Sequence, residues 1–209
     1  MPHGAGLGGG SGNAAAALWA ANELAGRPAS EADLLAWSGE IGSDISVFFS
    51  RGAAYCTGRG EIVEDTAPPV PLDTPLLLIK PPVGLSTPAI FKALDLERTS
   101  AAEPRAILDE LRNGGAITQA LCVNDLEAPA FQVLPELESL KQRLISTGLY
   151  SAVWMTGSGS TMVCAGSEEV PPFVAEDDAL FVRPARLITR AEGEWYKPAG
   201  VAEGVASAA

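Results

Sequence analysis

Residues 2–17 read Pro2-His3-Gly4-Ala5-Gly6-Leu7-Gly8-Gly9-Gly10-Ser11-Gly12-Asn13-Ala14-Ala15-Ala16-Ala17, a glycine-rich stretch that leads directly into helix-forming residues. Glycine has no Cβ and readily takes up positive φ angles, so the backbone N–H groups of such a loop can surround an anion. The residues from Asn13 to Leu24 predict a helix, with Ser11 or Asn13 as its N-cap and Gly26 at its end. The loop therefore meets a helix N-terminus, where free N–H groups and the helix dipole favour negative charge.

Three other interpretations of this stretch are weaker. Gly4 to Gly9 fit the pattern G-x-G-x-x-G, but the dinucleotide fingerprint needs a strand directly before it, and only three residues precede Gly4. A P-loop needs a lysine at its end, and the first lysine of this chain is Lys80. A flexible linker would also be rich in glycine, but it would not be expected to lead into a capped, alanine-rich helix.

The composition is that of an acidic globular protein. The chain has 209 residues, of which 47% are hydrophobic, and 14 basic against 26 acidic side chains give a formal net charge of −12. This size supports one or two domains with a core. The negative charge argues against binding to nucleic acid or to an anionic membrane surface. No stretch approaches the roughly 20 apolar residues of a membrane span, and no targeting pattern is visible at the start.

The cysteine and histidine residues predict neither a disulfide framework nor a metal cluster. Cys56, Cys122 and Cys164 are odd in number, widely spaced and without a CxxC pair, which fits a reducing compartment. His3 is the only histidine, so a cluster of histidine ligands is excluded. We therefore assign no metal-ligating residue.

Local patterns predict the order of the elements after the first helix. Ser30 and Asp33 have the spacing of a capping box at the start of a helix over residues 30–37. Residues 51–63 predict a hairpin, residues 65–75 a proline-rich linker, and residues 76–80 a buried strand. Further helices are predicted over residues 87–96, 104–112 and 126–146, followed by a strand, glycine loop and strand over residues 152–165. The Asn124–Glu127 segment is interpreted as the cap of the long third helix.

Several stretches resemble, in order, the motifs of the galactokinase, homoserine kinase, mevalonate kinase and phosphomevalonate kinase (GHMP) superfamily. Besides the glycine-rich stretch these are residues 41–45, 54–61, 86–92, 123–127 and 155–160. The resemblance implies an α+β GHMP kinase fold, with a partial N-terminal α/β unit (ribosomal protein S5 domain 2-like) in residues 1–66 and a ferredoxin-like C-terminal domain in residues 72–196. A disordered tail is expected over residues 197–209.

The same resemblance implies a role for the first loop and for one carboxylate. The residues expected to bind ATP, together with Mg²⁺, are Pro2, His3, Gly4, Ala5, Gly6, Leu7, Gly8, Gly9, Gly10, Ser11 and Gly12. From its local sequence Asp44 would be a turn or cap residue, whereas the resemblance implies that it is the catalytic base. Members of the family have strands, a substrate-binding region and a lysine before the glycine loop, so the chain is expected to be truncated at its start.

Four further residues have two interpretations each. Phe91 fits a core position by helical periodicity, whereas the resemblance implies that it stacks on a cytosine of the substrate. Gly157, Ser158 and Gly159 form a hairpin turn by local pattern, whereas in the family this loop helps to form the wall of the active site.

The resemblance implies a kinase that transfers phosphate from ATP to a small molecule. Within the family the sequence is most similar to the branch that phosphorylates the 2-hydroxyl of 4-diphosphocytidyl-2-C-methyl-D-erythritol in non-mevalonate isoprenoid synthesis. The end of the chain resembles plastid members of that branch, which predicts the chloroplast stroma, with the cytoplasm as the alternative. The rival interpretations are a truncated copy that only binds nucleotide and another small-molecule kinase of the same superfamily.

Overall fold

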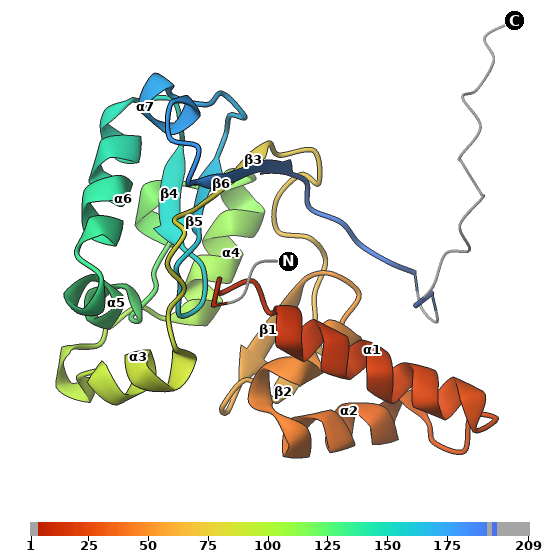
Figure 1. Cartoon of the computed structure of the whole chain (residues 1–209). Helices are drawn as coiled ribbons and strands as arrows, with labels where there is room; N and C mark the ends of the chain where they lie inside the picture. The colour runs from red at the N-terminus through yellow and green to blue at the C-terminus, as the bar shows by residue number, and fades with distance from the viewer. Residues whose placement is uncertain (1–3, 192–193, 196–209) are drawn as a thin grey trace, which may run out of the picture.

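The computed structural model describes residues 4–191 and 194–195. Pro2, His3 and the predicted tail of residues 197–209 lie outside the described residues. Figure 1 shows two units, with the glycine-rich loop between them. The proline-rich segment that was predicted as a linker connects the two units.

The N-terminal unit contains helices and a two-stranded sheet. Its elements are α1 (Gly9–Leu24), α2 (Glu31–Ile41), the 3₁₀ helix η1 (Ser43–Phe49), β1 (Ala54–Thr57) and β2 (Ile62–Asp65). The two strands pair antiparallel, with Ala54 opposite Asp65 and Thr57 opposite Ile62, which confirms the predicted hairpin. Helix α2 begins at the predicted capping box, since Asp33 N donates to Ser30 Oγ while Ser30 N donates to the Asp33 carboxylate.

Helix α1 begins four residues before its predicted start. Its N-cap is Gly8, with a φ of 64°, so Gly9, Gly10, Ser11 and Gly12 form its first turn rather than part of the loop. Neither Ser11 nor Asn13 is the cap, and no side chain caps the helix. The prediction was wrong because it placed the boundary at the first good helix former, whereas a glycine at positive φ can end the loop earlier.

The second unit is built on a four-stranded antiparallel sheet with the order β4-β5-β3-β6. Its strands are β3 (Leu76–Lys80), β4 (Ala152–Met155), β5 (Met162–Ala165) and β6 (Phe181–Ala185). Its helices are α3 (Thr87–Ala93), η2 (Leu96–Arg98), α4 (Pro104–Gly114), η3 (Gln119–Leu121), α5 (Glu127–Val133), α6 (Glu136–Ser146) and α7 (Pro172–Ala175). In the sheet, β3 lies between β5 and β6. This strand order, with the helices that connect the strands, is the predicted ferredoxin-like arrangement.

The long helix predicted over residues 126–146 is two helices. Helix α5 ends at Val133 and α6 begins at Glu136, with Pro135 between them. Proline clashes with a helical residue before it, and Leu134 accordingly has φ −138° and ψ 83°. The leucine periodicity continued across this break and concealed it, since Leu137 and Leu144 are buried on α6 while Leu134 packs on the same core from the break.

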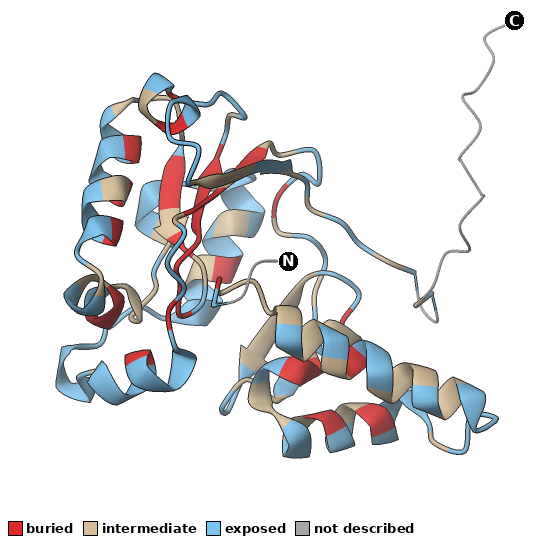
Figure 2. Cartoon of the chain, in the orientation of Figure 1, coloured by how far each residue is buried: buried red, intermediate tan, exposed pale blue. Residues whose placement is uncertain are grey.

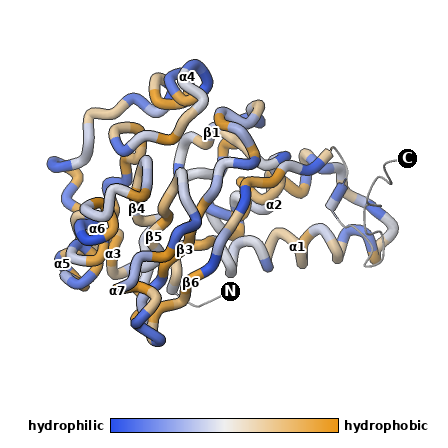
Figure 3. Tube along the Cα trace, turned by 90° about the horizontal axis from the view of Figure 1, so that it is seen from above, coloured by the Kyte–Doolittle hydropathy of each residue, from blue (hydrophilic) through white to orange (hydrophobic). Residues whose placement is uncertain are grey.

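The main core lies between one face of this sheet and the helices. Leu77, Ile79, Val153, Met155 and Met162 point to that face and are almost fully buried (Figure 2). Helices α5 and α6 cover it, whereas α1 and α2 lie on the other side of the sheet (Figure 3). Within the described part of the chain no helix is both long and apolar enough to cross a membrane.

The end of the described chain returns to the N-terminal unit. The Trp195 ring stacks on Trp19 of α1 with the ring centroids 5.7 Å apart, and the Arg190 guanidinium lies 3.9 Å from the centre of the Trp195 ring. Arg190 also donates to the carbonyl oxygens of Phe48 and Ser50 at the end of η1. The C-terminal segment therefore helps to hold α1 and η1 in place.

We predict that Ser30→Ala lowers the free energy of unfolding by about 0.5–2 kcal/mol, because it removes the cap of α2. Urea unfolding measures the change. Ser139→Ala is the matched control, since Ser139 is exposed within α6 and alanine is a good helix former there. Equal losses in the two variants would contradict the stabilising role of the cap.

Candidate functional site

The glycine-rich loop, residues 4–8, is fixed to the second unit through its own carbonyl groups. Its partners are the loop between β4 and β5, here called the 156–161 loop, and the segment before α3. The bonds run from Leu85 N and Ser160 N to Gly4 O (3.1 and 3.2 Å), from Thr161 N to Ala5 O (3.2 Å) and from Thr156 Oγ1 to Gly6 O (3.1 Å). The carbonyl groups of three successive loop residues therefore accept hydrogen bonds from the second unit.

Glycine is required where the two loops meet. Gly6 has a φ of 68°, and a Cβ added to it would lie 2.0 Å from Thr156 O. On the opposing side, a Cβ on Gly157 would lie 3.2 Å from Gly6 O. Real side chains essentially never approach other atoms as closely as 2.0 Å. The two loops can be in contact here because both residues are glycine and have no side chain.

The backbone N–H groups of this region are free to bind a ligand. Among the described residues, no hydrogen bond is donated by an N–H group of residues 6–11, and the first turn of α1 contains no acidic side chain. The first N–H groups of a helix have no acceptor within the helix and favour an anion. Of the side chains expected to bind nucleotide, that of Ala5 is buried, so this residue can contribute only its backbone.

Asp44 lies exposed in the first turn of η1, the element that packs under the start of α1. The Phe48 ring of η1 sits so close that a Cβ on Gly8 would be 2.8 Å from it, and one on Gly12 3.2 Å. The Asp44 carboxylate has no hydrogen bond or ion pair within the described residues, and no side-chain hydrogen bond caps η1. Burial, and secondarily this carboxylate, raises the pKa of the Cys56 thiol. Asp44 is therefore a solvent-accessible carboxylate without a structural partner among the described residues.

Phe91 is 56% exposed on α3, so its interpretation as a core residue is wrong. Helix α3 starts against the 156–161 loop, where the Thr87 and Ser158 hydroxyl groups are 2.7 Å apart. The hydroxyl of Ser158 is thus engaged within the protein, and Gly159 is also buried, whereas Gly157 is exposed beside the glycine-rich loop. The structure brings the start of α3, the 156–161 loop and the glycine-rich loop together.

The sequence did not predict how Asn124 and Glu127 contact the end of β4. Neither side chain caps α5, contrary to the expectation for this segment. Asn124 Nδ2 donates to the carbonyls of Met155 and Gly157, and Glu127 accepts from Met155 N while forming an ion pair of 2.5 Å with Lys141. Asp125 instead accepts from Ser100. The contacts with Met155 and Gly157 join residues about 30 positions apart, for which no local pattern exists.

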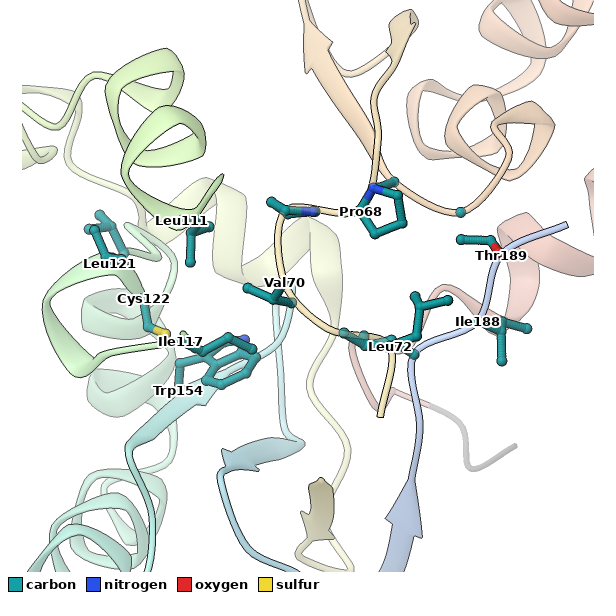
Figure 4. Close-up of a pocket in the computed structure, with 15 residues that line it drawn as sticks. Pro68, Val70, Leu72, Leu111, Ile117, Leu121, Cys122, Trp154, Ile188 and Thr189 are labelled. Atoms are coloured by element: carbon teal, nitrogen blue, oxygen red, sulfur yellow. The ribbon is translucent and has the colours of Figure 1, made fainter. Parts of the chain in front are cut away.

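An apolar cavity of about 340 Å³ lies elsewhere, against the face of the sheet opposite the main core (Figure 4). Its lining includes Trp154, Ile117 and Leu187, with Cys122, whose pKa burial raises to about 11. No lining residue belongs to the glycine-rich loop or to the 156–161 loop, and none carries a positive charge. The cavity offers nothing to hold a phosphate, so we place the candidate site at the glycine-rich loop.

We predict that Gly6→Ala destabilises the protein by about 2 kcal/mol or more beyond Gly26→Ala, as measured by denaturant unfolding. Gly26 has a φ of 84° and no atom within 4 Å of an added Cβ, so its variant reports only backbone strain of about 1–2 kcal/mol. The Gly6 variant must in addition release the hydrogen bonds between the two loops. An equal loss of unfolding free energy in the Gly6 and Gly26 variants would show that the loops are not in close contact.

Comparisons with known proteins find similar sequences. Residues 1–52 match the model of the GHMP kinases N terminal domain. A protein of Oryza sativa subsp. japonica named 4-diphosphocytidyl-2-C-methyl-D-erythritol kinase, chloroplastic, is 56% identical over 94% of this chain and 50% of its own length. The Arabidopsis thaliana protein of the same name is 52% identical over 100% of this chain and 56% of its own length.

A solved structure has a similar fold. The crystal structure of a 4-(cytidine 5'-diphospho)-2C-methyl-D-erythritol kinase aligns with a TM-score of 0.63 and 33% identity, covering 79% of this chain and 58% of that chain. The chain thus spans about half the length of the curated relatives it matches. On its glycine-rich loop, its fold and these similarities, the chain belongs to the GHMP kinase family.

Proposed function

We propose that this chain serves the ATP-dependent phosphorylation of the 2-hydroxyl of 4-diphosphocytidyl-2-C-methyl-D-erythritol. The names of its relatives support this substrate, since the rice and Arabidopsis proteins are both named as that kinase. The observation that carries the proposal is the orientation of the glycine-rich loop. Its carbonyls bind the protein, and its N–H groups, with those of the first turn of α1, remain for a polyphosphate.

ATP would bind through the backbone of residues 4–12, and Pro2 and His3 belong to the same proposed site. The loop contains no lysine, and Lys80 donates to the carbonyls of Pro81 and Val83, so N–H groups and the helix dipole must supply the attraction. No group of three or more metal-ligating side chains occurs among the described residues. The phosphate oxygens would therefore provide most ligands of Mg²⁺, which neutralises their charge.

Asp44 would act as the base for the acceptor hydroxyl. As the hydroxyl oxygen forms a bond to the γ-phosphorus, the bond from that phosphorus to the bridging oxygen of ADP breaks, and the hydroxyl proton passes to the carboxylate. The carboxylate is exposed and has no ion pair within the described residues, which leaves it ready to accept a proton. The packing of η1 under α1 supports its place at the same site.

The acceptor would lie between α3 and the 156–161 loop. Phe91 exposes its ring, as stacking on a cytosine requires. Gly157, Ser158 and Gly159 would form the adjoining wall, with the Ser158 hydroxyl holding the start of α3 rather than the ligand. Apart from this small-molecule substrate, we propose no partner.

We further propose that residues 1–66 and 72–196 are the two domains, joined by the proline-rich segment. Among its described residues the first holds one strand hairpin, β1–β2, and we propose that it is a partial GHMP unit. Because the plant relatives are named chloroplastic, we also propose a plastid location.

We predict that Asp44→Asn lowers turnover by about 10²–10⁴-fold while the Kd for MgATP stays nearly constant, because asparagine cannot accept the proton. Formation of ADP with 4-diphosphocytidyl-2-C-methyl-D-erythritol measures turnover, and equilibrium dialysis measures binding. Unchanged turnover would remove Asp44 from the mechanism. If the wild-type chain binds MgATP without turnover, it is a nucleotide-binding protein only, and turnover with another alcohol would indicate another kinase of the family.

We predict that Phe91→Ala raises the KM for the cytidine substrate by about 5- to 150-fold, which corresponds to the loss of about 1–3 kcal/mol of stacking. The KM for ATP should not change. Phe91→Tyr is the control, because it retains an aromatic face. Since the side chain is exposed, neither variant should alter the thermal midpoint by more than a surface substitution does. An unchanged KM in the alanine variant would contradict the stacking role.

A further inference from the structure

The outer edge of β4 is covered by side chains instead of by a strand. β4 lies at the edge of the sheet, with β5 on one side only. On the other side, the Gln119 amide donates to Val153 O (2.9 Å) and accepts from Val153 N (2.8 Å). Two residues further along, Glu127 accepts from Met155 N (2.8 Å) and Asn124 donates to Met155 O (2.7 Å). The segment from Gln119 to Glu127 thus takes the place of a neighbouring strand.

Asn124 differs from Gln119 because its contacts extend beyond the strand. Its Nδ2 also donates to Gly157 O at 2.8 Å, within the 156–161 loop, while its Oδ1 accepts from Leu126 N at 3.0 Å. Both amide protons and the amide oxygen are therefore used, and only one orientation of the amide satisfies all three bonds. The side chain joins the start of α5, the end of β4 and the 156–161 loop.

The position of Gly157 is transmitted directly to the glycine-rich loop. The backbone of Gly157 packs on Gly6, as the 3.2 Å between an added Cβ and Gly6 O indicates. In the same loop, Thr156 Oγ1 donates to Gly6 O and Ser160 N donates to Gly4 O. With no side chain between the loops to absorb a shift, a displaced Gly157 must displace Gly6 as well.

We propose that Asn124 is a positioning residue, whose side-chain amide sets the 156–161 loop and, through it, the ligand-binding conformation of the glycine-rich loop. This inference rests on the nucleotide site proposed above. Asn124 has no hydrogen bond to the glycine-rich loop or to the first turn of α1 among the described residues, and acts on both through the backbone of Gly157. Gln119 makes equivalent bonds to the same strand but reaches no loop residue, so its role is confined to the sheet.

The test compares Asn124→Asp with Gln119→Glu. Each replaces an amide by a carboxylate of the same shape, and each removes the donors to β4, but only Asn124→Asp also removes the bond to Gly157 O. Hydrogen exchange is measured in two peptides that contain the N–H groups bonded to the carbonyls of the glycine-rich loop, one covering Leu85 and one covering residues 156–161. The thermal midpoint and the Kd for MgATP by equilibrium dialysis are measured as well, all on the full 209-residue chain. Asn124→Ala repeats the comparison without a charge should the aspartate variant fail to fold.

We expect both variants to lower the thermal midpoint, because both weaken the edge of the sheet. Only Asn124→Asp should speed exchange in both peptides and raise the Kd for MgATP, each by about tenfold, as the loss of the bond to Gly157 O would. Wild-type exchange in both peptides of the Asn124 variants, or the same acceleration in Gln119→Glu, would overturn the inference.

The two proposals can fail separately. If the wild-type chain retains no MgATP, the proposed function fails, and the exchange of the two peptides still decides the positioning role. If the wild type binds MgATP and the Asn124 variants bind it equally well with unchanged exchange of both peptides, the nucleotide site stands and the positioning role is lost.

Discussion

The contact between two bare backbones, at Gly6 and in the 156–161 loop, is the constraint on which the arrangement of the two units depends. Hydrogen bonds to the carbonyls of Gly4, Ala5 and Gly6 hold the contact, and a Cβ on Gly6 would occupy the place of Thr156 O. Because these carbonyls turn inward, the N–H groups that follow remain free at the start of α1. One set of bonds therefore joins the units and prepares a site for an anion.

Contacts far from this site maintain the same arrangement. Behind the 156–161 loop, side chains of the segment before α5 complete the edge of β4, and the Glu127–Lys141 ion pair, with both side chains mostly buried, ties α5 to α6. On the other unit, Trp195 stacks on Trp19, and Arg190 binds the carbonyls that end η1. The 3₁₀ helix η1, which carries Asp44, is therefore in contact with Arg190 as well as with α1.

Local patterns predicted most elements but misplaced two boundaries. The capping box of α2, the β1–β2 hairpin and the buried strand β3 follow from interactions among residues close in sequence. Helix α1 begins earlier than predicted because a glycine at positive φ serves as its cap, and one predicted helix is split at Pro135 because the leucine spacing runs on across the break. Periodicity also favoured a core position for Phe91, although α3 turns that ring to solvent.

By itself the sequence determined the family and most of the elements, because glycine, proline and capping residues act on their own neighbourhood and the motifs recur in a known order. It also supplied the residues that we propose for the candidate site. Only the tertiary structure decided which groups of those residues are free: the carbonyls of the glycine-rich loop and the Ser158 hydroxyl are engaged, while its N–H groups and the Asp44 carboxylate are not. It also assigned Asn124 and Glu127 to the edge of β4. Such pairings join residues from about 30 to 150 positions apart, and they depend on how the sheet and loops pack, which no local pattern encodes.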